Sequence, residues 1–417
     1  MTCAEPLNDT GRLLSGAAPG LAAHRARYGP APVLGGPGEL VALVTAAGLR
    51  GRGGSGFPTA RKIAAVAAAS RRPVVVVNAC ESEPASAKDA TLLRHAPRLV
   101  LDGALVAARA LGADTVVLCV HRGTPLVGWL RAEVAARTGD GVAWQVAEVP
   151  RRYVASEASA LTRFLTTGEA RPAAKPPRPE RRGVRRRPTL VDNAETLAHL
   201  ALIARYGPGW YRSVGTAGDP GTTLVTVGGA VARPGVYEIA LGTPVGAVLA
   251  RAGGPTAELS ATLVGGYAGT WVTDPGTPLT HDPAGRYGAT VGAGVLVALP
   301  AAACGIAETA RILGYLADES AGQCGPCAFG LPAVADDLAR LAAGRPDPDL
   351  HDRLVRRVGV IAGRGACAHP TGAVRLAGSV RHAFAADVRA HLSGRPCRPH
   401  PPVLPLPAPH ERDRTWQ

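Results

Sequence analysis

Residues 49–62 read LRGRGGSGFPTARK, and this glycine-rich stretch decides how the first half of the chain is interpreted. Its glycines can adopt positive φ and bring backbone N–H groups close to a ligand, because no Cβ stands in the way. Arg52, Arg61 and Lys62 add positive charge beside them. Pro58 suits the first turn of a helix whose N-terminus would point at the same place. The stretch therefore predicts a phosphate-binding loop. Because it matches neither GxGxxG nor the Walker pattern, a flexible surface turn is the alternative.

Length and charge limit the classes of protein to consider. A chain of 417 residues is too long for one core and indicates about two to four domains, for which three is the working number. Apolar residues make up 46% and charged residues 19%, as in a globular protein. The net charge of +14 would permit nucleic-acid binding, but the one dense basic run, residues 178–187, has no interleaved aromatic residues. That run is interpreted as a solvated linker, with a phosphate-bearing cofactor or an acidic protein partner as the alternative, and no nucleic-acid partner is expected.

Targeting signals and cysteine usage indicate the compartment. The first residues, MTCAEPLNDTGRLL, lack a basic region followed by an apolar run, so a cytoplasmic protein is expected. Residues 287–307 are long and uncharged, but their glycines and Pro300 favour a buried strand and a loop over a membrane span. The eight cysteines are clustered, which in the cytoplasm favours metal or redox chemistry over disulfides.

Alternating strands and helices predict a parallel sheet in the first half. Short β-branched runs at 73–77, 114–120 and 142–149 alternate with helical patterns that include 59–69, 97–111 and 124–138. Such a sheet binds ligands at the carboxyl ends of its strands, where the polar segment 78–89 lies. Glu81 and Glu83 in that segment could accept hydrogen bonds from ribose hydroxyls or an amide, and a solvated acidic turn is the alternative.

The second half changes character twice. Residues 222–299 predict a compact β-rich unit with one helix, and residues from 308 to the mid 390s predict about four amphipathic helices. Between the halves, residues 178–187 are expected to be extended and residues 192–196 to open a helix. The tail after residue 396 is rich in proline and histidine, which predicts disorder.

Three cysteines in the helical region form a candidate metal group. Cys324 and Cys327 are a CxxC pair at the start of a helix, and Cys367 follows in a glycine-rich turn. Three thiolates suit an iron-sulfur cluster or another metal, although thioredoxin-like pairs and zinc sites use CxxC too. A fourth ligand is not obvious; Cys304 and His369 are the nearest candidates in the sequence.

Together these pieces resemble one family, the flavoprotein subunit of NADH:quinone oxidoreductase (complex I) and its relatives in NAD-reducing hydrogenases and formate dehydrogenases. The resemblance covers nearly the whole chain after residue 40, in the right order. The blocks that carry it are GLRGRGGSGFPT (48–59), NACESEP (78–84), KPP (175–177), PTLVDNAET (188–196), the β-rich stretch 222–299, and ESAGQCGPC (319–327) with Cys367.

The resemblance implies an α/β fold with a Rossmann-like FMN-binding domain, a small β-grasp (soluble-ligand-binding) module and a C-terminal helical bundle. The expected divisions are an N-terminal extension 1–38, the FMN domain 39–215, the β-grasp module 220–300, the bundle 306–395 and the tail 396–417. It implies noncovalent FMN, NADH as hydride donor, an iron-sulfur cluster of the 4Fe-4S or 3Fe-4S type and a ferredoxin-like or other redox subunit as partner, without membrane insertion.

Site residues follow from the resemblance, position by position. Those that would hold FMN are Gly51, Arg52, Gly53, Gly54, Lys62, Asn78, Asn193 and Thr196. Those on the nucleotide side would be Phe57, Glu81, Glu83 and Glu157. The cluster ligands would be Cys324, Cys327 and Cys367, and no side chain is expected to be catalytic because hydride transfer takes place on the flavin.

The sequence departs from the family pattern at several positions. Ala321 stands where the family has its first cluster cysteine, so a three-iron cluster, a four-iron cluster with water or Cys304 as a ligand, or no cluster would each fit. Ala65 and Arg178 stand where phenylalanines would stack on adenine. Other replaced positions are Cys80 for an aspartate, Asp192 for an asparagine and Ala158 for a glutamate. The expected function is a flavin oxidoreductase using NADH or NADPH, and the alternative is an FMN-binding scaffold that has lost NADH oxidation.

Overall fold

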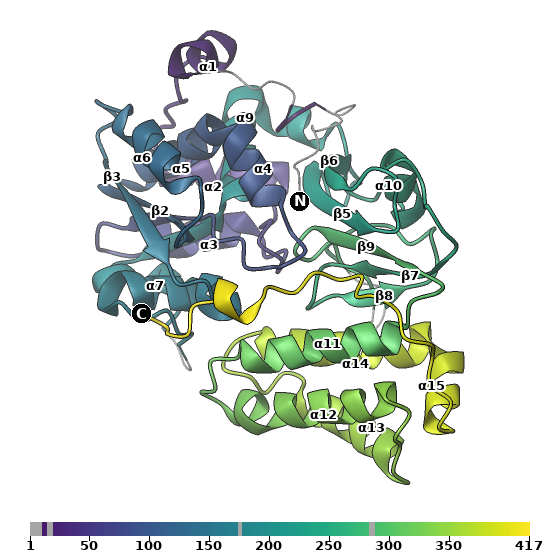
Figure 1. The fold of residues 1–417 in the computed structure, drawn as a ribbon. Coiled ribbons are helices and arrows are strands. Elements are labelled where there is room, and N and C mark those ends of the chain that lie inside the picture. The colour runs from purple at the N-terminus through teal and green to yellow at the C-terminus, as the bar shows by residue number, and fades with distance from the viewer. Residues whose placement is uncertain (1–10, 15–19, 174–176, 283–287) are drawn as a thin grey trace.

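Three groups of elements make up the fold: a parallel sheet with helices, a second sheet, and a set of C-terminal helices (Figure 1). The computed structural model describes residues 11–14, 20–173, 177–282 and 288–417. Lys175 and Pro176 of the KPP block, and the first ten residues of the expected N-terminal extension, lie outside these ranges.

The first sheet is parallel throughout and has the order β3-β2-β1-β4. Its strands are β1 (Val74–Asn78), β2 (Thr115–His121), β3 (Ala143–Val149) and β4 (Thr189–Asn193). β2 and β4 flank β1 on opposite sides, so the chain reverses its direction of strand addition at β1. Ligands of such sheets bind outside the carboxyl ends of the strands at this switch point. Asn78 and Asn193 pair in register there.

Helices cover both faces of this sheet, because its strands are apolar on both sides. Val75 and Val77 belong to a core shared with α2, α5 and α9, whereas Val74 and Val76 belong to a core shared with α7. The α-helices are α1 (Leu21–Tyr28), α2 (Pro37–Ala47), α3 (Thr59–Ala67), α4 (Lys88–His95), α5 (Pro97–Leu111), α6 (Val127–Ala135), α7 (Ala158–Thr167), α8 (Pro179–Arg182) and α9 (Ala194–Arg212). Short 3₁₀ turns lie at Tyr153–Ser156 and Val184–Arg186.

Three local predictions differ from this part of the structure. The sequence predicts only a polar segment at 78–89, but α4 begins within it at Lys88. Residues 178–187 are not simply extended, since they contain α8 and a 3₁₀ turn. The helix expected at 192–196 begins at Ala194, because Thr189–Asn193 form β4. This five-residue strand ends on polar side chains, so a search for apolar runs does not detect it.

The second sheet has the order β6-β5-β9-β7-β8, in which only the central pair β5 and β9 is parallel. Its strands are β5 (Thr222–Gly229), β6 (Gly235–Ala240), β7 (Leu259–Val264), β8 (Thr270–Val272) and β9 (Val295–Pro300). Helix α10 (Val245–Arg251) packs on it through Val245, Val248 and Leu249. The uncharged stretch at 287–307 thus contains a buried strand, β9, as its glycines predicted.

The C-terminal helices share one apolar core of leucine, valine and alanine. They are α11 (Gly305–Asp318), α12 (Leu331–Ala342), α13 (Leu350–Ile361), α14 (His369–Ala383) and α15 (Ala385–Leu392), with a π-helical turn at Pro326–Gly330. Among the described residues, no helix combines the length and apolar character needed to cross a bilayer.

The tail packs along the molecule, in place of the disorder that its composition predicts. It runs from α15 past the second sheet to the side of α7 (Figure 1). Glu308 accepts hydrogen bonds from the backbone of Val403 and Leu404, and Leu404 is buried. Near the terminus, Trp416 is buried and its carbonyl accepts a hydrogen bond from Ala170. Buried apolar side chains and backbone hydrogen bonds therefore fasten this proline-rich segment to α11 and to the chain that follows α7. A 3₁₀ turn at Pro409–Glu411 interrupts it.

Candidate functional site

The glycine-rich loop lies at the carboxyl end of β4. Gly51 N–H donates to the Phe57 carbonyl at 2.9 Å, which closes the loop. The backbone N–H of Arg52 donates to Thr196 Oγ1 at 2.9 Å, and a Cβ on Gly53 would lie 3.4 Å from that of Asn193. The loop is therefore fixed beside the start of α9. Positive φ is adopted by Gly54 (104°) and Gly56 (59°).

The side chain of Arg52 points into the protein. It is 2% exposed, and its guanidinium donates to Tyr211 Oη at 2.8 Å and to the Thr222 carbonyl at 3.1 Å. Thr222 begins the second sheet, so Arg52 ties the loop to that sheet. The loop's backbone, rather than this guanidinium, is what the structure presents toward the strand ends.

Lys62 approaches the same edge of the sheet from α3. Its ammonium group donates to Asp192 Oδ1 at 2.9 Å and to the Val191 carbonyl at 3.0 Å. Asp192 is 2% exposed, and burial raises the pKa of its carboxyl despite the nearby lysine. Its Oδ2 atom is buried with no hydrogen-bond partner among the described residues.

Asn78 and Asn193 meet at the switch point, one at the end of each central strand. Asn78 Nδ2 donates to the Ser156 carbonyl at 2.8 Å. Asn193 caps α9 by accepting from Glu195 N–H at 3.0 Å, and its Nδ2 donates to Asp89 Oδ2 at 2.7 Å. Both amides are therefore held in fixed orientations at the place where a ligand of this fold binds.

A buried ionic network supports Asn193 from behind, and no sequence motif predicts it. The Lys88 ammonium group lies 2.7 Å from Asp89 Oδ1 and 3.0 Å from Glu195 Oε2, and Lys88 is 4% exposed. Although burial alone would raise it, the pKa of Glu195 is held low by Lys88. Burial alone would lower the pKa of Lys88, but the two carboxylates raise it. Arg52 Nε adds a contact of 3.8 Å to Glu195.

Two of the predicted nucleotide-side carboxylates cap helices in this structure. Glu81 accepts from the backbone of Asp89 and Ala90, each at 3.1 Å, at the start of α4. Glu157 accepts from Ser159 N–H at 2.9 Å and Ala160 N–H at 3.1 Å at the start of α7. Such caps stabilise the first turn of a helix. Their roles toward a nucleotide stay predictions.

Glu83 is the third predicted carboxylate, and it is almost fully buried. Its Oε2 accepts from Tyr153 Oη at 3.0 Å and from Tyr267 N–H at 3.1 Å, which links the first sheet's strand end to the second sheet. Oε1 is buried with no partner among the described residues. Burial raises the pKa of Glu83 to about 7, with Tyr267 and Tyr153 opposing the shift.

Replacing Glu83 by glutamine should change how stability depends on pH. Because burial raises the pKa of Glu83 to about 7, the folded state keeps a proton that the unfolded chain loses near pH 4.5. The wild type should therefore lose stability as the pH rises from about 4.5 to about 7, by about 3 kcal/mol in all. The Glu83→Gln variant should not show this loss of stability, because glutamine does not titrate. Urea unfolding of both ligand-free proteins from pH 4 to 8 measures the free energy of unfolding. If the difference in this free energy between the two proteins stayed constant over the range, the prediction would be contradicted.

Phe57 lies at the end of the glycine-rich loop. It is half-buried, and the Arg61 guanidinium carbon lies 5.5 Å from its ring centroid. Ala65, at one of the positions of the expected adenine clamp, is on α3 with Arg61. The other position, Arg178, precedes α8, which packs on α3. The two replaced positions therefore come from neighbouring helices, on the side of the loop where Phe57 lies.

The three predicted cluster cysteines gather in the C-terminal region. Cys327 is buried on the π-helical turn, and Cys324 precedes it, half-buried. Burial and the neighbouring Cys324 and Cys367 raise the pKa of Cys327 to about 12. Burial raises the pKa of Cys367 as well, with the Glu157 carboxylate contributing. The cysteine group therefore lies within electrostatic range of the start of α7.

Neither suggested fourth ligand joins this group. Cys304 caps the N-terminus of α11, whereas Cys324 follows its C-terminus. Since α11 has 14 residues, the two cysteines are about 20 Å apart along it. The suggestion that Cys304 completes the cluster is therefore wrong. His369 Nε2 donates to the Leu316 carbonyl at 2.8 Å, and burial lowers the pKa of this histidine.

The residues present fit the groups that the sequence implies. At the switch point, Asp192 Oδ2 and Glu83 Oε1 are buried acceptors without partners among the described residues, which hydroxyl and N–H donors of a flavin nucleotide would satisfy. In the cysteine group, Cys324 and Cys327 share one turn and Cys367 interacts with both electrostatically, and thiolates are the ligands that iron-sulfur clusters use. The fold and these sites define a cofactor-binding redox protein.

Comparisons with known proteins agree with this class. The Nuo51 FMN-binding domain model matches residues 44–202, the SLBB domain model matches 224–266, and the NADH-ubiquinone oxidoreductase-F iron-sulfur binding region matches 307–391. The second NADH-quinone oxidoreductase F protein of Rhizobium meliloti is 31% identical, over 87% of this chain and 91% of the relative. The F protein of Streptomyces coelicolor is also 31% identical, over 87% and 84%. The chain belongs to the family of NADH-quinone oxidoreductase F subunits.

Solved structures show the same fold. An NAD⁺-reducing [NiFe]-hydrogenase in its H₂-reduced state superposes with a TM-score of 0.79 at 31% identity, over 88% of this chain. The air-oxidised state gives a TM-score of 0.80 at 29% identity, over 96% of this chain. This chain spans 64% and 67% of those two hydrogenase chains. The mixed fold with a Rossmann-like parallel sheet, a second sheet and C-terminal helices is confirmed.

Proposed function

We propose that this chain is the FMN-carrying subunit of an NADH-oxidising redox assembly, and that it passes electrons through its cysteine group to a protein acceptor. The observation that carries the proposal is the glycine-rich loop beside Asn78 and Asn193 at the switch point of the parallel sheet. When bound, FMN accepts a hydride from the nicotinamide and releases the two electrons singly. The protein contributes binding, orientation and electrostatics.

Each polar group at the strand ends has a distinct part in that binding. The backbone of residues 51–56 can approach the ligand closely because its glycines carry no side chain. Lys62 supplies a positive charge that Asp192 holds in place at 2.9 Å. Asn78 and Asn193 offer amide groups whose orientations their partners have already fixed. Preorganised groups of this kind lower the entropic cost of binding.

Reduction by a nicotinamide nucleotide tests the proposed function directly. The full chain, purified without oxygen and reconstituted with FMN, should show the visible absorption band of a bound flavin. NADH or NADPH should bleach that band in stopped-flow measurements. Protein that is colourless after incubation with FMN and removal of the unbound flavin would overturn the proposal.

Replacing Gly53 by alanine should weaken FMN binding without affecting folding. An added Cβ would lie 3.4 Å from Asn193 Cβ, an ordinary contact, and Gly53 does not have positive φ. The methyl group would, however, occupy the side on which the loop approaches FMN, so the dissociation constant should rise about tenfold, equivalent to about 1.4 kcal/mol. Flavin fluorescence quenching measures it.

Gly128→Ala is the matched control for that variant. Gly128 lies on α6, and an added Cβ there would have no neighbour within 4 Å. This substitution should leave FMN affinity unchanged and stability unchanged or slightly higher, because alanine favours helices. Equal FMN affinities in the Gly53 and Gly128 variants would remove the loop from the proposed binding site.

The choice of nicotinamide nucleotide rests on the two replaced clamp positions. Without aromatic rings at Ala65 and Arg178, each lost stacking contact weakens adenine binding by about 0.5–1.5 kcal/mol. Arg178 is exposed before α8, where Arg181 and Arg182 are exposed too. This positive charge favours a nucleotide with a 2′-phosphate. We propose NADPH as a substrate alongside NADH, and the ratio of the flavin reduction rates with the two nucleotides, measured by stopped flow, tests this proposal.

The acceptor is proposed to be a ferredoxin-like or other redox subunit that docks near the cysteine group. Phe329 lies on the same π-helical turn as Cys327, and 78% of its surface is exposed. An exposed aromatic residue beside a redox centre is suited to the middle of a protein interface. The relatives are named as subunits, which supports an assembly. A cytoplasmic location is part of the proposal.

A scaffold that binds FMN without being reduced is the second candidate function. It is favoured by Ala158 and Ala321, which replace a carboxylate of the nucleotide site and a thiolate of the cluster. Such a protein would acquire the flavin band, yet neither NADH nor NADPH would bleach it. The stopped-flow experiment above therefore distinguishes the two functions.

A further inference from the structure

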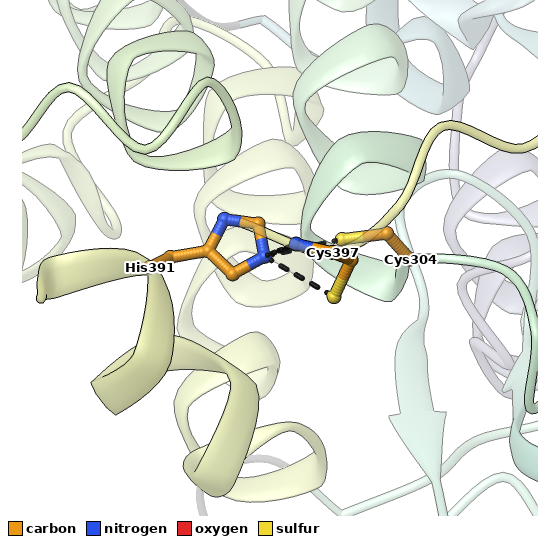
Figure 2. A group of neighbouring side chains, drawn as sticks. All are labelled: Cys304, His391 and Cys397. Atoms are coloured by element: carbon orange, nitrogen blue, oxygen red, sulfur yellow. Dashed lines mark hydrogen bonds between the residues drawn. The ribbon is translucent and has the colours of Figure 1, made fainter. Parts of the chain in front are cut away.

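Three metal-ligating side chains meet outside both sites described above. Cys304 precedes α11, His391 lies in the last turn of α15, and Cys397 begins the tail. Their ligand atoms all lie within 4.8 Å of one another, and Figure 2 shows the two sulfurs facing the same imidazole edge. Elements far apart in sequence thus bring two soft sulfur ligands and one nitrogen ligand to a single point.

The spacing suits one tetrahedral ion. His391 Nε2 lies 3.2 Å from Cys397 Sγ and 3.7 Å from Cys304 Sγ. A tetrahedral zinc ion with Zn–S of about 2.3 Å and Zn–N of about 2.0 Å separates sulfur and nitrogen ligands by about 3.5 Å. The two distances lie on either side of that value, so small side-chain rotations would admit the ion.

Surrounding groups orient the three ligands. The other imidazole nitrogen of His391, Nδ1, lies 2.9 Å from the Leu341 carbonyl. Donation of the Nδ1 proton to this carbonyl leaves the Nε2 lone pair directed at the sulfurs, as in histidines that bind metals. Ala307 N–H donates to Cys304 Sγ at 3.4 Å, which stabilises a thiolate there. Cys397 N–H also donates to Nε2, at 3.0 Å, and a bound metal would replace this contact together with the two contacts between Nε2 and the sulfurs.

The group formed by Cys304, His391 and Cys397 is open to solvent on one side only, the side of the tail. Cys304 is 7% exposed and His391 is 1% exposed, while Cys397 is only partly buried. An ion can therefore enter from the side of the tail, and a water molecule can take the fourth position. The group is separate from Cys324 and Cys327, which lie beyond the far end of α11.

We propose that Cys304, His391 and Cys397 form a zinc site that fastens the tail to the helical bundle. Binding releases the two thiol protons to solvent, so two thiolates balance the charge of Zn²⁺. Two thiolates and an imidazole select zinc among common divalent ions by softness and geometry. The tail continues from Cys397 to Val403 and Leu404, whose N–H groups donate to Glu308 on α11. The metal therefore closes the tail onto the helix that Cys304 caps.

Metal content and cobalt spectroscopy on the full chain test this proposal. Wild-type protein should bind one equivalent of Zn²⁺ that resists dialysis. Substituted Co²⁺ should give tetrahedral d–d bands and a thiolate-to-cobalt charge-transfer band. Cys304→Ser and Cys397→Ser should each lose that equivalent and those bands. Cys327→Ser is the matched control, because it alters the other cysteine group and should keep them.

Amide exchange provides a readout that a merely buried cysteine pair would not change. Removal of the zinc by a chelator should speed hydrogen exchange at Val403 and Leu404 by about tenfold or more, while exchange in β1 stays unchanged. Retention of the cobalt bands in the Cys304→Ser, Cys397→Ser double variant would overturn the proposal. A disulfide between Cys304 and Cys397 in protein that contains no zinc would also overturn it.

Discussion

Replacing Lys88 by methionine should destabilise the folded protein by about 3–5 kcal/mol, because it leaves two buried carboxylates without their cation. Lys88 is 4% exposed and contacts Asp89 at 2.7 Å and Glu195 at 3.0 Å. Methionine keeps most of the side-chain volume, so the loss reports charge rather than packing. Chemical unfolding of the ligand-free proteins at pH 7 measures it. FMN affinity should fall too, since this network holds Asn193 in place.

The matched control is Arg340→Met. Arg340 pairs with Asp336 at 3.0 Å on α12, but both side chains are more than half exposed, at 53% and 63%. An exposed pair of this kind contributes about 0.5 kcal/mol or less. If Lys88→Met and Arg340→Met unfolded at the same denaturant concentration, the buried network would not have the stabilising role assigned to it.

The elements that could be predicted are those whose signal is local. The runs at 73–77 and 114–120 are apolar on both faces and became β1 and β2, and the periodic stretch 97–111 became α5. Helix α4 was missed because its residues, KDATLLRH, are polar in the first turn. Two hydrogen bonds to residues outside the helix stabilise that turn: Glu81 accepts from Asp89 N–H, and Thr226 Oγ1 on β5 accepts from Ala87 N–H. Neither contact can be predicted from the eight residues of the helix.

The candidate sites also divide into those with a local sequence signal and those formed by residues far apart in the sequence. The glycine-rich loop and the CxxC pair are short motifs, so the sequence predicts them directly. The Lys88 network joins positions more than one hundred residues apart, and no spacing rule connects them. Cys304, His391 and Cys397 are separated by 87 and 6 positions, which matches no metal-binding spacing, and their proximity depends on how α11 and α15 pack. The loop motif places the positive charge of Arg52 beside the glycines, but it does not predict that the guanidinium donates to Tyr211 Oη and to the Thr222 carbonyl of the second sheet.

Replacing Cys327 by serine should remove the iron-sulfur cluster completely. Of the three cluster cysteines, Cys327 is the one that is buried, and both Cys324 and Cys367 help to raise the pKa of its thiol. With two thiolates left, the site falls below the number of ligands that such clusters need. Iron and acid-labile sulfide should fall to background, and the reduced protein should give no cluster EPR signal. FMN and its bleaching by NADH should remain. Cys304→Ser, which alters the other cysteine group, should keep its iron.

Replacing Ala321 by cysteine should have the opposite effect. Position 321 lies three positions before Cys324, as Cys324 lies three positions before Cys327, so the new thiol begins a CxxCxxC run. With Cys367 it supplies four thiolates, the usual set for a four-iron cluster. We expect iron to rise from about three to about four per chain and the EPR signal to change to that of a four-iron centre. Ala132→Cys, on the exposed face of α6, should change neither. Equal iron in the wild type and Ala321→Cys would contradict this expectation, because it would mean that a ligand other than cysteine already completes the wild-type cluster.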